Sequence, residues 1–384
     1  MRDVLPELLH WWTSGHTVGM GTVTGTLRSA PRSAGTAMLV GPEGTAVGSV
    51  SGGCVESAVY ELAKSVVETG APVTQRYGFS DDDAFAVGLT CGGTIDMFVE
   101  PISQQTFPEF GRLVASIRDN KPVAVATITA GRADQIGRHL VVWLDHVAGH
   151  LGSVRLDNAV RDDVRGLLSN GRTATLTYGL GGERLGAGLS VFVSSFAPAP
   201  RMLVFGAIDF AAAVAKIGSF LGYRVTVCDA RPVFATARRF PDADEVVVDW
   251  PHRYLRSQVD SGALDGRTVI CVLTHDPKFD VPVLITALTL PVAYVGAMGS
   301  RRTHEDRVAR LRQAGVSQSD LHRLSSPIGL DLGARTPEET AISIAAEIVA
   351  HRWDGTGHPL SNTTCSIHHE SRSLLPAAPT TSLA

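Results

Sequence analysis

The sequence predicts an α/β protein: an N-terminal α/β domain built from two similar subunits, followed by a Rossmann-like parallel-sheet domain. Three observations lead to this fold class. Residues 18–101 and 122–198 repeat one order of strands and helix. A proline-rich break at Pro198-Ala199-Pro200 is typical of a linker. Beyond it, buried strands alternate with helices, which favours a parallel sheet. The expected parts are domains at residues 1–197 and 201–351 and a flexible tail at 352–384.

The composition predicts a globular protein that binds neither nucleic acid nor membrane. Hydrophobic residues make up 44% of the 384 residues and charged residues 19%, which is enough for a large core. The net charge of −4 provides no basic surface for nucleic acid. No apolar run reaches the roughly 20 residues that span a membrane. Five scattered cysteines favour free thiols in a reducing cytoplasm over disulfides; they are Cys54, Cys91, Cys228, Cys271 and Cys365.

The first repeat begins after a short apolar helix predicted over residues 5–12. Apolar residues between 55 and 67 then recur at helical spacing, and Gly70 ends this pattern. Runs of apolar and β-branched residues predict strands on both sides of this helix, at 19–27, 37–40, 46–48, 73–78 and 95–99.

The second repeat follows the same order, and two short matches relate it to the first. Gly48-Ser49-Val50 and Gly152-Ser153-Val154 lie 104 positions apart, and the pairs Tyr77-Gly78 and Tyr178-Gly179 lie 101 apart. The pattern predicts a helix over 158–168 and strands over 123–129, 139–144, 173–179 and 189–194.

The turn before the first repeat's helix carries its candidate chemistry. Residues 48–56 (GSVSGGCVE) deliver Cys54 to the start of a helix. Amides there attract anions and lower the pKa of a thiol, so we expect a partial thiolate that suits a soft metal or sulfur transfer. The alternative is a buried, inert cysteine in a tight turn. The predicted site residues of this turn are Ser51, Gly52, Gly53 and Cys54, with Cys54 as a candidate metal ligand.

A second glycine–cysteine motif is Cys91-Gly92-Gly93. The second repeat has Arg155-Leu156-Asp157 where the first has residues 51–54, and it has no counterpart of the second motif. We therefore expect the chemistry in the first repeat, with Cys54 and Cys91 as the reactive residues. Arg28 and Arg32 lie on a predicted loop that either closes over an anionic ligand or is simply solvated.

The second domain is predicted to contain five strands and to end in a helix. Thr336-Pro337-Glu338-Glu339 has a threonine N-cap, a proline at the first helical position and a glutamate three residues after the cap. A helix should therefore begin there and run to about residue 350. The expected strands are 202–205, 224–228, 245–248, 268–273 and 292–295.

The loop after the first of these strands is a degenerate dinucleotide fingerprint. Gly206 keeps the first position, but Ile208 replaces the middle glycine, and Asp209 beside it would repel a phosphate. Asp229 follows 23 residues after Gly206, where a carboxylate accepts a hydrogen bond from a ribose hydroxyl. Two interpretations stay open: a modified nucleotide site, and a Rossmann-like domain that binds no dinucleotide.

Polar residues after two later strands complete the candidate site. His275 and Asp276 follow the fourth strand, and parallel topology places them opposite Gly206. A strand-to-helix turn after the fifth strand offers amides and guanidinium groups to an anion; the alternative is an exposed, charged helix start. The residues of this turn are Gly299, Ser300, Arg301 and Arg302.

Four motifs in this order resemble the XdhC/CoxI family. They are residues 48–56 (GSVSGGCVE), 90–93 (TCGG), 293–302 (AYVGAMGSRR) and 327–334 (PIGLDLGA). The resemblance implies a chaperone rather than a catalyst. Such a protein binds molybdenum cofactor, protects it during sulfuration and delivers it to a xanthine-dehydrogenase-type molybdenum hydroxylase.

The resemblance also implies roles for individual residues. Cys54 would coordinate molybdenum or protect the sulfurated form, and Cys91 would be a second ligand or relay. The turn at Gly299 would hold phosphates of molybdopterin or its dinucleotide form, with a nucleotide in the Rossmann-like domain. The implied partners are an apo molybdenum hydroxylase, a cysteine-desulfurase-type sulfur donor and, if the chain forms a homodimer, a second copy. Two alternatives stay open: an NAD(P)-binding oxidoreductase and a structural component of a hydroxylase.

Overall fold

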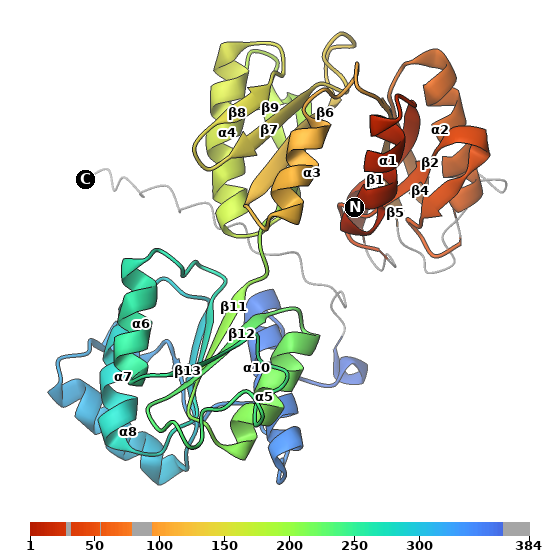
Figure 1. Cartoon of the computed structure of the whole chain (residues 1–384). Coiled ribbons are helices and arrows are strands. Elements are labelled where there is room, and N and C mark those ends of the chain that lie inside the picture. Colours follow the sequence, from red (N-terminus) through yellow and green to blue (C-terminus); the bar gives the residue numbers. More distant parts are fainter. Residues whose placement is uncertain (28–31, 54, 79–93, 364–384) are drawn as a thin grey trace, which may run out of the picture. The chain divides into compact units, whose positions relative to one another are not determined.

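The protein is seen here as a computed structural model that describes residues 1–27, 32–53, 55–78 and 94–363 (Figure 1). Its contacts divide the chain into two compact units, unit 1 (Met1–Pro198) and unit 2 (Ala199–Ala384). Unit 1 contains two antiparallel sheets with helices, and unit 2 contains one parallel sheet with helices. This architecture confirms the predicted fold class.

The first repeat of unit 1 is a five-stranded antiparallel sheet in the order β3-β2-β1-β5-β4. Helix α2 (Glu56–Thr69) packs on it through the buried face formed by Val59, Ala63 and Val66. The strands are β1 (Val18–Leu27), β2 (Ala37–Val40), β3 (Ala46–Gly48), β4 (Val73–Gly78) and β5 (Thr94–Ile102). The other elements are η1 (Arg2–Val4), α1 (Leu5–Thr13) and η2 (Pro42–Gly44).

The second repeat has the same topology, β8-β7-β6-β10-β9. Helix α4 (Val154–Ser169) packs on its sheet as α2 packs on the first, through Leu156, Val160 and Val164. The remaining elements are α3 (Phe110–Arg118), β6 (Val123–Ala130), β7 (His139–Trp143), β8 (Val147–Gly149), β9 (Ala174–Gly179) and β10 (Gly188–Phe196).

The two repeats correspond residue by residue, but one predicted match was wrong. Gly48 ends β3 and Gly149 ends β8, both with positive φ, of 89° and 81°. A Cβ on either would collide with a carbonyl oxygen of the neighbouring strand, from Ala37 and His139 respectively. Gly48 therefore corresponds to Gly149, 101 positions on, and not to Gly152. This is the same spacing as that of the two Tyr-Gly pairs.

Contacts between the repeats are reciprocal. The hydroxyl of Thr74 on β4 donates to the carbonyl of Thr129 on β6 (2.7 Å), and that of Thr175 on β9 donates to the carbonyl of Thr24 on β1 (3.0 Å). A shared apolar cluster from both repeats includes Leu8 of α1 and Leu113 of α3. Unit 1 is thus a pseudo-symmetric pair of folded repeats with a common core.

Unit 2 is a six-stranded parallel sheet in the order β13-β12-β11-β14-β15-β16. The strand order reverses between β11 and β14, and ligands of such folds bind at the carboxyl ends of the strands beside this switch point. The strands are β11 (Arg201–Phe205), β12 (Arg224–Asp229), β13 (Glu245–Val248), β14 (Val269–Val272), β15 (Tyr294–Ala297) and β16 (Leu324–Ser325).

Helices cover both faces of the unit 2 sheet (Figure 1). On one face, α5 (Asp209–Phe220) and α10 (Pro337–Trp353) share an apolar cluster with the strands. On the other face, the packed helices are α6 (Pro251–Asp260), α7 (Pro277–Thr289), α8 (Arg301–Gln313) and α9 (Gln318–Leu321), and η3 (Leu360–Asn362) follows α10. Both sides of the sheet are buried, as the apolar strand sequences require.

Two helix boundaries show how caps decide where a helix begins. Thr336 and Glu339 form the predicted capping box, and α10 runs three residues beyond 350 to Trp353. Helix α4 begins at Val154 rather than at 158, because the Ser153 hydroxyl accepts the Leu156 amide proton and acts as N-cap. The tail residues 364–384 lie outside the described residues.

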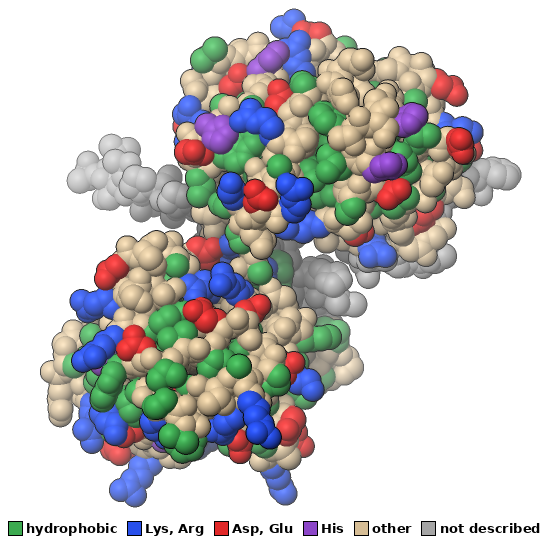
Figure 2. Space-filling view, in the orientation of Figure 1, with side chains coloured by type: hydrophobic (Ala, Val, Ile, Leu, Met, Phe, Trp, Pro, Cys, Tyr) green, Lys and Arg blue, Asp and Glu red, His purple; other side chains and the backbone are tan. Residues whose placement is uncertain are grey.

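The described part of the chain contains no helix with the length and apolar character needed to cross a membrane. On the face of unit 2 that Figure 2 shows, basic and acidic side chains are interspersed among apolar and neutral ones.

Candidate functional site

The glycine-rich turn of the first repeat is organised around the carboxylate of Glu56. Its oxygens accept hydrogen bonds from the amides of Ser51 (2.9 Å), Gly52 (2.9 Å) and Gly53 (2.8 Å). The hydroxyls of Ser49 (2.8 Å) and Ser51 (2.5 Å) donate to it as well. Burial alone would raise the pKa of Glu56, but these hydrogen bonds outweigh it and lower the pKa to about 2. Glu56 is therefore ionised at neutral pH.

This arrangement changes what the turn can offer a ligand. The sequence predicts that the amides before the helix face a thiolate or another anion, whereas those of residues 51–53 donate to an anion within the chain. Gly52 and Gly53 have φ of 79° and 120°, and a Cβ on either would meet no atom within 4 Å. The two glycines are thus required for backbone conformation rather than for close packing. Cys54 itself lies outside the described residues.

The second repeat has a simpler version of the same turn. Asp157 lies 101 positions after Glu56, and its carboxylate accepts one amide proton, from Leu151 at 2.8 Å. A carboxylate in the first turn of α4 is favourable because the amide end of a helix carries partial positive charge. Both repeats therefore have a carboxylate in the first turn of the helix, and only in the first repeat do several groups of the preceding loop donate hydrogen bonds to it.

The other residues predicted for unit 1 are not placed by the structure. Cys91, Gly92, Gly93 and Arg28 lie outside the described residues, and Arg32 is exposed. The structure therefore neither brings Cys54 and Cys91 together nor separates them.

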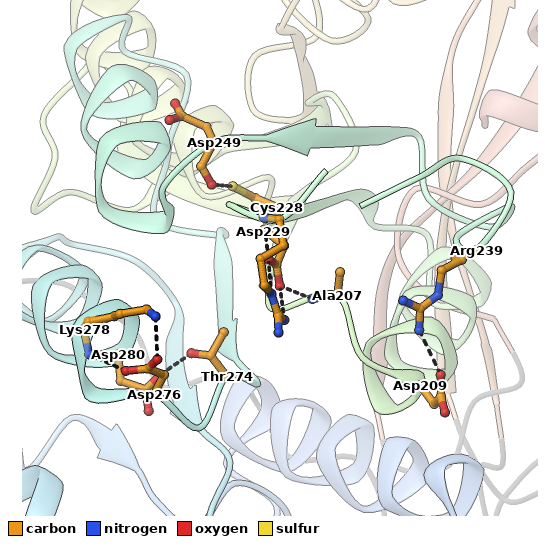
Figure 3. A network of polar contacts seen from close by, with 11 residues as sticks. Ala207, Asp209, Cys228, Asp229, Arg239, Asp249, Thr274, Asp276, Lys278 and Asp280 are labelled. Carbon is orange, nitrogen blue, oxygen red and sulfur yellow. Dashed lines mark hydrogen bonds and ion pairs between the residues drawn. The ribbon is translucent and has the colours of Figure 1, made fainter. Parts of the chain in front are cut away.

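Two of the five cysteines are buried in unit 2. Burial raises the pKa of Cys228 and of Cys271 to about 12. The Cys228 thiol donates to the carbonyl of Asp249 at 3.4 Å (Figure 3). Neither thiol is a nucleophile near neutral pH. The other three cysteines, 54, 91 and 365, lie outside the described residues.

In unit 2, Gly206 lies at the switch point, against the end of β14. Its φ is 117°, and a Cβ there would come within 2.9 Å of the Thr274 side chain and 3.0 Å of the Thr274 amide nitrogen. Only glycine allows this approach. The glycine at the first position of the fingerprint is explained by packing between β11 and β14, without reference to a ligand.

The carboxylate of Asp229 already has hydrogen-bond donors within the protein. Its side chain is 2% exposed and accepts hydrogen bonds from the Ala207 amide (2.7 Å), the Arg231 amide (2.9 Å) and the Arg231 guanidinium (2.8 and 2.9 Å) (Figure 3). Burial raises its pKa, but Arg231 and these amides lower it below the ordinary value. A carboxylate has about four acceptor positions, so a ribose hydroxyl would have to displace one of these donors.

Asp209 begins α5 and pairs with Arg239 at 3.1 Å (Figure 3). A carboxylate already stands at the helix end that would receive a pyrophosphate in a dinucleotide-binding loop. Together with the use of the Ala207 amide by Asp229, this disfavours ordinary dinucleotide binding on the loop after β11.

A pocket of about 510 Å³ opens beyond this loop, at the carboxyl ends of β14 and β15. We call it the switch-point pocket. Its size falls within the range of small-molecule sites, about 300–1,000 Å³. It contains three of the predicted residues, His275, Gly299 and Ser300, beside the apolar side chains of Phe210, Met298 and Ile328.

The remaining predicted residues lie around this pocket. Asp276 is the N-cap of α7, accepting the Lys278 amide proton (3.1 Å) and pairing with the Lys278 ammonium group (3.0 Å) (Figure 3). Arg302 lines a second, adjacent hollow, and Arg301 is exposed at the start of α8.

A buried ionic network beside this pocket was not predicted from the sequence. Asp280 and Arg307 are each 3% exposed and form an ion pair of 2.9 Å. The Thr274 hydroxyl donates to Asp280, and the Arg307 guanidinium also donates to the carbonyl of Met298 (2.7 Å) and the hydroxyl of Ser326 (3.0 Å). Burial raises the pKa of Asp280 despite these donors. The sequence signal for this network is a charged residue on the buried face of each helix, Asp280 on α7 and Arg307 on α8.

Among the described residues, no three His, Cys, Asp or Glu side chains lie close enough together to hold a metal ion. The described lining of the switch-point pocket therefore offers a ligand apolar and hydrogen-bonding groups rather than a set of metal ligands.

Both units match known families. Residues 11–78 and 116–179 match a model of the XdhC and CoxI family, and residues 202–348 match a model of the XdhC Rossmann domain. A Bacillus subtilis (strain 168) protein, described as a probable xanthine dehydrogenase subunit, is 28% identical over 338 residues, which is 87% of this chain and 92% of that protein.

Two further relatives extend over nearly the whole chain. The Escherichia coli (strain K12) molybdenum cofactor insertion chaperone PaoD is 26% identical over 353 residues, 91% of this chain and 88% of PaoD. A crystal structure from Bacillus halodurans described as a xanthine dehydrogenase has a TM-score of 0.64 and 25% identity, and the match covers 95% of this chain and 98% of that one. With its two units matched in order, the chain belongs to the XdhC/CoxI family.

Proposed function

We propose that this protein binds molybdenum cofactor, protects it during sulfuration and delivers it to a molybdenum hydroxylase of the xanthine dehydrogenase type. The name of the relative PaoD supports the cofactor, and that of the Bacillus subtilis relative supports the kind of partner. The observation that carries the proposal is the switch-point pocket, which combines an apolar wall with a helix start.

The residues of this pocket fit the organic part of the cofactor. Phe210, Met298 and Ile328 provide apolar surface for a flat ring system. Gly299 and Ser300 begin α8, where backbone amides favour a phosphate. When bound, the cofactor would supply the molybdenum and sulfur chemistry, and the pocket residues would hold and orient it.

The first repeat is proposed to supply the thiol chemistry of this function. Cys54 is the candidate molybdenum ligand or guard of the sulfurated form, and Cys91 the second ligand or relay. The partners proposed with this role are the apo hydroxylase and a cysteine-desulfurase-type sulfur donor, and a homodimer is compatible with it. Support from the structure is indirect: Cys228 and Cys271 are too deeply buried for this chemistry.

The test is cofactor retention by the full chain, produced in cells that make molybdenum cofactor and purified gently. Pterin fluorescence after oxidation and molybdenum content by mass spectrometry measure what it carries. Thr340→Phe places a ring in the pocket and should lower pterin retention at least tenfold. Ile342→Phe, on the same helix but 53% exposed, should not change it.

The thiol role is tested separately. Cys54→Ala should lower molybdenum retention and activation of the apo hydroxylase, whereas Cys365→Ala in the tail should change neither. Absence of pterin from the purified wild-type chain, or co-purification of NAD(P) in its place, would contradict the proposed function. Retention that is unchanged in the Cys54 variant would remove only the thiol from it.

A further inference from the structure

A groove between α7 and α8 lies beside the switch-point pocket and has no assigned role. It has a volume of about 250 Å³, and we call it the α7–α8 groove. The two hollows share His275 and Thr303, so a ligand in one is in reach of the other. The groove is distinguished by three arginines of α8, Arg302, Arg307 and Arg310.

Two of these arginines are exposed on the helix surface. Arg302 and Arg310 lie eight residues apart, about two helical turns, which brings them to the same side of α8. Neither guanidinium group has a hydrogen-bond or ion-pair partner in the part of the chain that the structure describes. Arg312, two residues further on, is instead bonded to Gln318 (3.3 Å) and does not line the groove.

The third arginine is buried and has one donor for which the described residues offer no acceptor. Arg307 is 3% exposed, and its two terminal nitrogens donate to Asp280, Met298 and Ser326. Its Nε has no partner among the described residues. A buried donor without an acceptor costs free energy. Because Arg307 lines the groove, we expect an oxyanion bound there to accept a hydrogen bond from this nitrogen.

The charge of the groove favours an anion. Its lining includes three guanidinium groups and two carboxylates, those of Asp280 and Asp306, which leaves a net charge of +1. Asp280 is already engaged by Arg307 and Thr274 and is not available to a ligand as a free charge. Arginine matches the geometry of phosphate oxygens through paired N–H donors.

We propose that the α7–α8 groove is a phosphate-binding subsite for the small molecule whose ring system occupies the switch-point pocket. The identity of that molecule rests on the proposed function. The predicted affinity of the groove for phosphate does not depend on it. The shared chemistry is a phosphate ester, and its source is either a single phosphate or the diphosphate of a dinucleotide.

Titration calorimetry of the full chain with inorganic phosphate and inorganic pyrophosphate tests this subsite. The double variant Arg302→Gln/Arg310→Gln should bind the tighter of the two probes at least tenfold more weakly than wild type. Arg307→Lys keeps the charge but lacks Nε, and we expect a several-fold loss. Arg312→Gln is the matched control and should stay within twofold. Pyrophosphate as the tighter probe assigns a diphosphate, and phosphate as the tighter probe assigns a single phosphate.

Two results separate this subsite from the function it rests on. If the double variant binds both probes as Arg312→Gln does, the subsite is refuted even where pterin retention is intact. If the wild type carries no pterin but its pyrophosphate affinity depends on Arg302 and Arg310, the subsite stands and the cofactor assignment fails. Both replaced side chains are exposed, and an unchanged circular dichroism spectrum verifies the fold.

Discussion

The two repeats of unit 1 have the same strand order and the same helix placement, yet the turn before the helix differs. In the second repeat, Asp157 accepts one backbone amide. In the first, Glu56 accepts three well-placed amides and two hydroxyls from residues 49–53. A carboxylate in the first turn of the helix is thus common to both repeats, but only in the first is it the centre of a hydrogen-bonded loop, formed by residues 49–53.

A second difference lies between the repeats. Glu100 on β5 and His139 on β7 are buried with 3.0 Å between carboxylate and ring, and Phe107 stacks on the imidazole at 4.0 Å. Glu100 pairs with Met20 of β1, and Ser194 on β10 pairs with Val125, the residue of β6 at the same position in the second sheet. Ser194 therefore corresponds to Glu100. This contact between a carboxyl group and an imidazole therefore has no equivalent at Ser194 and breaks the pseudo-symmetry.

The largest expected effect comes from removing this contact. His139→Ala removes a buried ring that stacks on Phe107 and lies against Glu100, which should lower the free energy of unfolding of unit 1 by about 2–5 kcal/mol. Hydrogen exchange of β5 and β7 peptides, followed by mass spectrometry, measures the loss.

The matched control is an exposed pair in the same unit. Arg76 and Asp96 lie opposite each other on β4 and β5, with Arg76 72% exposed. Arg76→Gln should cost less than about 1 kcal/mol. Equal losses in the two variants would show that the buried contact contributes no more than a surface pair.

The next effect compares the two capping carboxylates directly. Glu56→Ala leaves several amides without an acceptor and should cost about 2 kcal/mol, whereas Asp157→Ala removes one contact and should cost about 1 kcal/mol. Urea unfolding with exchange of α2 and α4 amides separates the two. A larger loss for the Asp157 variant would contradict the assignment of Glu56 as the centre of the loop.

The smallest effect is on the pH dependence of stability. The pKa of Glu56 is lowered in the folded chain from 4.5 to about 2. Its contribution is therefore complete above the unfolded pKa and is lost as the pH falls from about 5 towards 2. Glu56→Gln should reduce the drop in urea midpoint over this interval, because the neutral amide does not titrate.

Asp157→Asn is the control for the pH profile. In this variant, the urea midpoint should still fall between about pH 5 and pH 2 by the amount that depends on Glu56. An identical pH profile for wild type and Glu56→Gln would mean that the hydrogen bonds around Glu56 do not favour its ionised form.

Much of the fold could be predicted because its signals are local. The strands of unit 2 are short apolar runs, and the N-terminus of α10 follows from a capping box of four residues. The gathering of His275, Gly299 and Ser300 could also be predicted, since carboxyl ends of neighbouring parallel strands meet at one edge. The number of residues that separates equivalent positions of the two repeats was harder to predict. Gly149 and Gly152 are equally good matches to Gly48 in the sequence, and only the structure shows that β8 ends at Gly149.

The site could be predicted only in part. Asp229 was placed on the right strand end, but its donors, Ala207 and Arg231, could not be anticipated from spacing. Asp280 and Arg307 have a charge pattern that resembles ordinary solvated helix faces. Their burial depends on α7 and α8 packing side by side.

The sequence by itself determined the order of elements, the duplication of unit 1 and the strand ends where ligands of this fold are bound. These features depend on hydrophobic periodicity and on capping within a few residues. Tertiary structure alone decided which polar groups already have partners: Glu56 has the loop before it, Asp229 has Arg231, and the two terminal nitrogens of Arg307 have acceptors up to 27 residues away. The reason is physical, because a buried hydrogen bond depends on which atoms meet in space, and the folded conformation of the chain decides that, both within loops and between elements distant in sequence.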